Sequence, residues 1–235
     1  WIFIVYVFSF LCYTPMMLKK LGIEFPNMLT YLKYFFVIMP ALVSIIFILC
    51  EQNLKKFLIG NFKKVSLKEL FICMIIALVG IVTTFFYSFF GKIDLFTDSM
   101  VVFLINCVYL FITALIEEIA WRGFLLRNLF TKNKKIKVII FVGVIWTIWH
   151  IPMWLIRNSL PILDILYLSI WTMLISIILG VLYYVYENIF SVALLHMIFN
   201  VCFLAPVKNN NIVIMFFSIV AIILFKNKKK ISNST

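Results

Sequence analysis

One uncharged apolar stretch, from Val101 to Ile116, constrains this chain more than any other feature, because it ends in two adjacent acidic residues, Glu117 and Glu118. Such a stretch is typical of a helix that spans a lipid bilayer. A carboxylate in or near hydrocarbon costs several kcal/mol of free energy, so by default it marks a functional site. The sequence therefore predicts a membrane helix that carries a functional acidic pair at one end.

The composition extends this prediction to the whole chain of 235 residues, which is 65% hydrophobic and only 13% charged. A water-soluble domain of this size needs more polar surface. We therefore expect an all-α, polytopic membrane protein that forms a single transmembrane domain over residues 1–235. About eight transmembrane helices are expected, at Trp1–Met17, Tyr34–Cys50, Leu70–Phe90, Met100–Phe130, Val138–Leu155, Ile162–Tyr186, Ile189–Leu204 and Ile212–Phe225.

The positive charge lies between these apolar runs rather than inside them. The net charge is +12, and lysines concentrate in Glu51–Glu69, in the loop before Val138 and in the C-terminal tail. The positive-inside rule then predicts a multi-pass protein of the cell membrane with both termini in the cytoplasm. The lysines are expected to contact anionic lipid of the bilayer, not nucleic acid. Glu51–Glu69 itself fits either a basic helix lying in the membrane surface or a plain cytoplasmic loop.

Local signals predict where helices break. Pro152 removes a backbone donor and disfavours helix at the preceding residue, so the helix should kink or end just after His150. Glu187 and Asn188 predict a very tight turn between two spans. The cysteines are odd in number and lack a C-x-x-C pair, so we expect small buried apolar side chains rather than disulfides or zinc ligands, at Cys12, Cys50, Cys73, Cys107 and Cys202.

Both histidines of the chain, His150 and His196, lie inside apolar runs. A lone histidine on an apolar face is more often a satisfied core residue than a functional one. Here both histidines of the chain lie in apolar runs, and an acidic pair also lies inside a membrane run, so the pattern favours a functional role for them. Each histidine lies within a few helical turns of a connection that the charge pattern places in the cytoplasm. We therefore expect the histidines and glutamates to meet in the inner half of the bilayer, in a cavity open to the cytoplasm.

The spacing of the polar residues predicts two pairs. Glu118 and Arg122 are four residues apart, share a helix face and can form an ion pair that keeps the carboxylate oriented. Glu117 points about 100° away and would face the cavity. His196 and Asn200 are also four residues apart, which suits two donors to a developing oxyanion.

These groups are suited to hydrolysis of a peptide bond. A carboxylate takes a proton from water, and a histidine holds that water or protonates the leaving amine. Alternatively, Glu117, His150 and His196 could bind Zn²⁺ with an activated water in the fourth position, although no H-E-x-x-H occurs. Trp146 stands one turn before His150 and could line the substrate site, or be an ordinary aromatic residue of the span. The sequence leaves these alternatives open.

Two other classes fit part of the pattern. A proton-coupled transporter uses intramembrane Glu and His residues as relays, and a broken helix such as the one at Pro152 can line a substrate site. A b-type haem protein would use His150 and His196 as axial ligands, but it leaves the acidic pair and Arg122 unexplained.

Three short motifs follow one another on successive helices: EEIAWRG from Glu117, WTIWH ending at His150, and HMIFN from His196. They resemble the E-E-x-x-x-R, F-x-x-x-H and H-x-x-x-N motifs of the CAAX protease and bacteriocin-processing (Abi) family. Trp146 replaces the phenylalanine of the second motif. The resemblance extends over about residues 101–204, which we take as the catalytic core helices.

The resemblance implies an eight-helix intramembrane endopeptidase. Family members resemble prenyl-protein endopeptidases or are linked to bacteriocin processing and immunity, which implies a membrane-associated peptide or lipidated protein as substrate. It also implies roles: Glu117 as general base, His150 as its partner on the water, His196 with Asn200 as the oxyanion site, and Arg122 with Glu118 as structural support. The family has been described both as metalloproteases and as metal-free glutamate proteases, and we favour the metal-free version. A catalytically inactive immunity protein remains an alternative.

Overall fold

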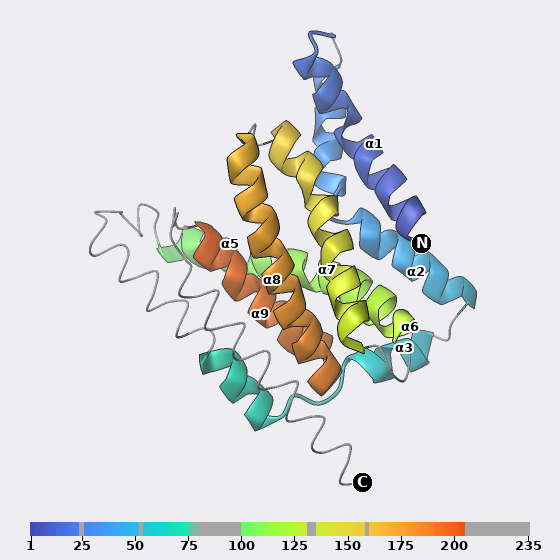
Figure 1. The fold of residues 1–235 in the computed structure, drawn as a ribbon, viewed down its shortest axis with the longest axis vertical. Coiled ribbons are helices and arrows are strands. Elements are labelled where there is room, and N and C mark those ends of the chain that lie inside the picture. Colours follow the sequence, from blue (N-terminus) through green and yellow to red (C-terminus); the bar gives the residue numbers. More distant parts are fainter. Residues whose placement is uncertain are drawn as a thin grey trace. The chain divides into compact units, whose positions relative to one another are not determined.

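The computed structural model describes residues 1–23, 26–51, 54–75, 78, 100–130, 135–157 and 160–204. In these ranges the chain is helical except for short turns and one isolated antiparallel bridge, between Phe62 and Asn188 (Figure 1). The expected span Ile212–Phe225 lies outside the described residues, and Leu70–Phe90 lies largely outside them. The all-helical class is confirmed for the described part of the chain.

Four helical runs of the described part are long and apolar enough to cross a membrane. Two of them are single helices, α1 (Ile2–Lys20) and α8 (Ile162–Tyr186). The third joins α5 (Met100–Glu118), η2 (Ile119–Leu126) and α6 (Arg127–Leu129). The fourth joins α7 (Lys135–Pro152) and η3 (Met153–Arg157). A fifth candidate is a pair of helices bent by 58°, η1 (Asn27–Phe35) and α2 (Met39–Glu51). The shorter apolar helix α9 (Ile189–Leu204) follows α8. These elements correspond to six of the eight expected spans.

The basic segment Glu51–Glu69 is helical only in part. The helix α3 (Leu54–Asn61) is followed by extended backbone at 63–66, and a new helix begins at Leu67. Ser66 and Glu69 form a capping box at this start, because each side chain accepts a hydrogen bond from the other residue's backbone N–H at 3.2 Å. The segment is therefore two helices with a defined break between them.

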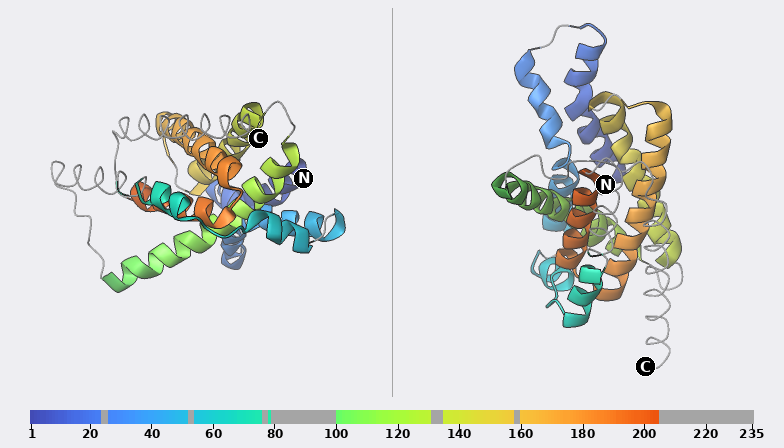
Figure 2. Two further views of the ribbon diagram at one scale, coloured as in Figure 1. Left: turned by 90° about the horizontal axis from the view of Figure 1, so that it is seen from below. Right: turned by 90° about the vertical axis from the view of Figure 1, so that its left-hand side faces the viewer.

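The chain divides into two compact units, each built from two separate stretches of sequence. The first contains Trp1–Leu58 and Ile119–Ser176, and the second contains Ile59–Glu118 and Ile177–Thr235. In the first unit, α1 packs beside η1 and α2 (Figure 2), and η2 packs against α2 and α7. Trp149 lies at the centre of this unit, stacked on Phe36 at 4.1 Å and donating its indole N–H to the Ser9 hydroxyl at 3.0 Å.

In the second unit, α5 packs along α9 (Figure 1). The predicted tight turn between α8 and α9 is confirmed, since Glu187 adopts a left-handed backbone conformation with φ of 51°. This turn is fixed to the segment after α3: Glu187 forms an ion pair with Lys63, and the Asn188 amide donates to the Lys63 carbonyl at 2.8 Å. The start of α9 therefore has a fixed position within its unit.

The expectation of buried cysteines is confirmed for two of the four whose side chains the structure describes, and the side chain of Cys202 lies outside the described residues. Cys12 and Cys73 are buried, and Cys107 is partly buried. Cys50 is exposed, so the prediction of burial is wrong there. It lies near the end of α2, on a helix whose outer face carries other exposed apolar side chains such as Ile46 and Leu49.

Candidate active site

The acidic pair lies at the point where α5 changes its helical geometry. Glu117 and Glu118 are the last two residues of α5, and the chain continues from them as the π-helix η2. Both side chains are buried, with 7% and 0% of their surface exposed. π-helices account for well under 1% of residues in proteins and are frequent at functional sites. Local backbone and burial thus both single out this part of the chain.

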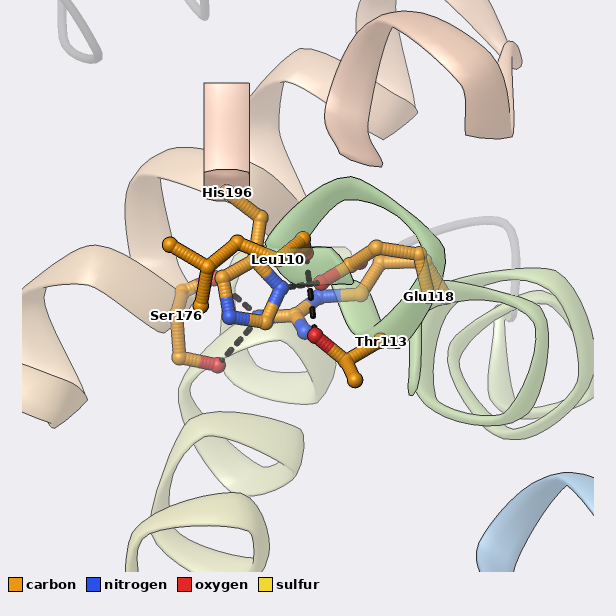
Figure 3. A network of polar contacts seen from close by, with 6 residues as sticks. Leu110, Thr113, Glu118, Ser176 and His196 are labelled. Atoms are coloured by element: carbon orange, nitrogen blue, oxygen red, sulfur yellow. Dashed lines mark hydrogen bonds and ion pairs between the residues drawn. The ribbon is translucent and has the colours of Figure 1, made fainter. Parts of the chain in front are cut away.

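Within the second unit, Glu118 contacts His196. The Nδ1 atom of His196 lies 2.8 Å from Oε1 of Glu118, and His196 is only 3% exposed (Figure 3). The packing of α9 on α5 brings the two side chains together although they are 78 positions apart in the sequence. When Glu118 is a carboxylate, which only accepts hydrogen bonds, Nδ1 of the ring is the donor. The contact fixes the orientation of the imidazole.

Arg122 is fully buried in the first unit, where it has partners that the sequence did not suggest. Its guanidinium donates to the Ser176 hydroxyl at 2.8 Å and to the Ser176 carbonyl at 3.3 Å, and it lies 4.8 Å from the centre of the Trp146 ring. The expected pairing with Glu118 assumed α-helical spacing, whereas η2 begins directly after Glu118. Glu118 belongs to the second unit, so this pairing stays a prediction.

His150 lies near the end of α7 and is surrounded by tryptophans. Its Nδ1 atom is 2.8 Å from the Trp146 carbonyl, and the rings of Trp146, Trp149 and Trp154 lie 4.7, 4.8 and 5.6 Å from its own. A carbonyl only accepts, so Nδ1 donates and the lone pair of the neutral ring is on Nε2. The helix was predicted to kink or end just after His150; the α-helix α7 does end at Pro152, but the chain stays helical as the π-helix η3, so the two form one run.

The residues predicted for the site are divided between the two units. Arg122, Trp146 and His150 belong to the first, and Glu117, Glu118, His196 and Asn200 belong to the second. Asn200 is partly exposed and follows one turn after His196 on α9. The structure describes each unit by itself, so a single site built from all of these residues stays a prediction.

The set expected for Zn²⁺ also combines both units and stays a prediction, with Glu117 and His196 in one and His150 in the other. Within either unit, the described residues include no group of three His, Cys, Asp or Glu side chains that could hold a metal ion.

Sequence reasoning missed two residues of these contacts, Ser176 and Trp154. Ser176 is a buried hydroxyl inside the apolar helix α8, and its polarity in that run was the available signal. Trp154 follows Pro152 outside any motif, and only the three-dimensional structure shows that it stacks on His150.

The fold and these contacts together define an all-helical membrane protein with a buried carboxylate–imidazole pair and two π-helical turns beside its motif residues. Residues 97–202 match the family described as "Type II CAAX prenyl endopeptidase Rce1-like". Through this region, which is less than half of the chain, the chain is similar to the Rce1-like type II CAAX prenyl endopeptidase family. The resemblance inferred from the three motifs is thereby confirmed.

A curated relative supports the same assignment. The chain is 29% identical over 148 residues to "CAAX prenyl protease 2" of Methanococcus maripaludis. The match covers 56% of this chain and 53% of the relative, so the chain spans about half the length of the curated relative it matches.

Proposed function

We propose that this protein is an intramembrane endopeptidase that hydrolyses a peptide bond of a membrane-associated peptide or protein with a glutamate-activated water. One observation carries the proposal beyond family similarity: Glu118 and His196, from two separate motifs, are in direct contact at 2.8 Å in a buried environment. Burying an acid and an imidazole in an apolar helical protein costs free energy, so such a pair marks a functional site by default. The core helices of this enzyme are residues 101–204.

Each polar residue has a role in the proposed reaction. Glu117 removes a proton from the attacking water, and Nε2 of His150 accepts a hydrogen bond from the same water and orients it. The water oxygen then attacks the carbonyl carbon of the substrate. The resulting oxyanion is stabilised by Nε2–H of His196 and the amide of Asn200. The proton taken by Glu117 passes to the leaving amine.

The contact between Glu118 and His196 explains how His196 can donate to the oxyanion. A neutral ring with its proton on Nδ1 has only a lone pair on Nε2 and cannot donate from it. A ring protonated on both nitrogens donates from Nδ1 to Glu118 and from Nε2 to the oxyanion. Glu118 is therefore a positioning and charge-compensating residue in this proposal.

The metal-free mechanism is the version we propose, and the Zn²⁺ alternative is tested directly. Zn²⁺ held by Glu117, His150 and His196 would supply an activated hydroxide. Cleavage that survives exhaustive chelation, with a metal content well below one ion per chain by mass spectrometry, supports the metal-free version. Cleavage that is lost on chelation and restored by added Zn²⁺ refutes it.

The substrate class and the topology are parts of the same proposal. The name of the relative refers to a prenyl protease, and for this chain we propose a CAAX-type lipidated peptide or a bacteriocin-related peptide at the bilayer. Both termini are proposed to face the cytoplasm of a cell membrane. A membrane-impermeant maleimide applied to intact cells should then fail to label a cysteine added at the C-terminus and should label it after lysis.

The decisive experiment compares two buried glutamates of the second unit in proteoliposomes. Glu117→Gln should abolish cleavage of prenylated and unprenylated test peptides, since an amide cannot take a proton from water. Glu69→Gln is the matched control, because Glu69 is 2% exposed and lies outside the motifs, and it should keep activity. Cleavage by Glu117→Gln at the unaltered rate would show that the base is misassigned. Folded protein with no cleavage of any peptide would favour the inactive alternative.

A further inference from the structure

The ring of His150 needs more than one hydrogen bond to hold a single orientation. Rotation about the bond between Cβ and Cγ is broad for histidine, and a half-turn exchanges the positions of the two ring nitrogens. The Trp146 carbonyl at 2.8 Å holds Nδ1 but does not restrain the plane of the ring. Neighbouring side chains must therefore bound the ring on its faces and edges.

Three indoles of the first unit provide these boundaries. Trp146 and Trp149 stand almost perpendicular to the imidazole, at 86° and 87°, with ring centres 4.7 and 4.8 Å away. Trp154 lies nearly parallel to it, at 25° and 5.6 Å, and is only 5% exposed. Trp154 is thus the ring that lies against the face of His150 and opposes its rotation out of plane.

The position of Trp154 follows from the backbone. Pro152 has no N–H to donate to the carbonyl four residues earlier, so the α-helical ladder cannot continue unchanged past His150. The chain widens instead into η3, which begins at Met153. Trp154 is four residues after His150 and returns to the same side of the helix, where its indole reaches the imidazole.

The Trp146 ring, which also borders His150, is itself held in place by a neighbour. Arg122 lies 4.8 Å from the Trp146 ring and is itself held by two hydrogen bonds to Ser176. A continuous series of contacts therefore runs from Ser176 on α8 through Arg122 and Trp146 to His150. Trp154 stacks on the same ring from η3.

We propose that Trp154 is a positioning residue that holds the imidazole of His150 in the orientation in which Nε2 meets the attacking water. The inference rests on the proposed function for its kinetic consequence, but its structural part stands on the ring contacts alone. Trp154 touches neither substrate nor water in this proposal and acts only through His150.

Two substitutions and a control test the kinetic consequence. Trp154→Leu keeps an apolar side chain but removes the flat ring, and it should lower kcat about 10- to 100-fold with KM unchanged, because misplacing a reacting group by about 1 Å costs on the order of 10²-fold. Trp154→Phe restores a stacking ring and should recover most of kcat. Trp171→Leu removes another buried tryptophan, on α8, and should leave kcat within about twofold of the unsubstituted enzyme. Equal kcat for Trp154→Leu and Trp154→Phe would overturn the proposal.

A spectroscopic measurement separates this inference from the enzymatic proposal. The chain contains two histidines, so histidine-labelled protein in detergent gives two sets of imidazole signals, which His150→Gln assigns. A stacked indole shields the ring below it, so Trp154→Leu should shift the His150 signals and leave those of His196 in place. Unshifted His150 signals refute the stacking role whatever the activity. Shifted signals with no cleavage activity in the unsubstituted protein would support the stacking and refute the endopeptidase.

Discussion

Removing the carboxylate of Glu118 is the most informative single change, because it exposes the energetic role of the pair with His196. Glu118→Ala leaves a 3%-exposed imidazole without its 2.8 Å partner. If the pair is ionised, breaking it should lower the free energy of unfolding by about 3–5 kcal/mol, since an uncompensated charge stays buried. Glu118→Gln keeps an oxygen acceptor of the same size and should cost less, about 1–2 kcal/mol.

The coupling between the two side chains discriminates between an ion pair and a neutral hydrogen bond. A double-mutant cycle of Glu118→Ala and His196→Phe, each of which removes the contact, can be measured by reversible unfolding in mixed micelles. Side-chain hydrogen bonds between membrane helices average about 0.6 kcal/mol and reach about 1.7 kcal/mol in such cycles. A charge-assisted bond should exceed this average, so we expect a coupling free energy of about 1.5–3 kcal/mol.

A small coupling free energy would refute the role assigned to Glu118. A coupling below about 0.5 kcal/mol would mean that the two groups do not interact in the folded protein, and the role assigned to Glu118 would be withdrawn. The pair Glu69→Gln and His196→Phe is the control cycle. Its two effects should add within about 0.5 kcal/mol, because the hydrogen bonds described for Glu69 are with Ser66, at the start of another helix.

Three further predictions follow from contacts of the described residues. Arg122→Lys should lower stability by about 1–3 kcal/mol in thermal or denaturant unfolding, because a lysine cannot reproduce both bonds to Ser176, and Ser176→Ala should cost less, about 1 kcal/mol. Glu69→Gln should leave the free energy of unfolding unchanged or raise it. Glutamine also completes the capping box, and among the described residues one carboxylate oxygen of Glu69 is buried without a hydrogen-bond partner. Glu69→Ala should lower the free energy of unfolding by about 0.5–2 kcal/mol in the same measurement. Nitrogen chemical shifts should show that neutral His150 carries its proton on Nδ1, and a proton on Nε2 would contradict the bond to the backbone.

The helical spans could be predicted because apolar length alone determines them. The runs that became α1, α7 and α8 agree with the predicted ranges to within a few residues at most ends. The end of the α-helix near His150 and the turn at Glu187 were also predictable, since a missing proline N–H and a two-residue connection are local properties, although the sequence did not indicate that the chain continues as a π-helix. The same local reasoning placed the buried acidic pair at the end of its helix.

The partners of the polar residues could not be predicted in the same way. The sequence predicted Glu118 as the partner of Arg122, which stays a prediction, but it gave no indication of the bonds from Arg122 to Ser176 or of the π-helix that begins at Ile119. The contact of His196 with Glu118 and the contact of Arg122 with Ser176 both depend on how distant helices pack. The stacking of Trp154 on His150 is local, but it depends on the π-helix η3. Motif order indicated which residues matter, but not which residue touches which.

The wide helical turn after Glu118 makes the spacing of this region as important as its chemistry. An α-helix advances about 100° per residue, and a π turn contains one residue more than an α turn. Deleting a single residue from 124–126 would keep every motif letter, yet it would rotate the later side chains of the helix by about 100° relative to the acidic pair. A one-residue gap at this point in an alignment would therefore mark a rearranged helix face, whereas many substitutions there would not.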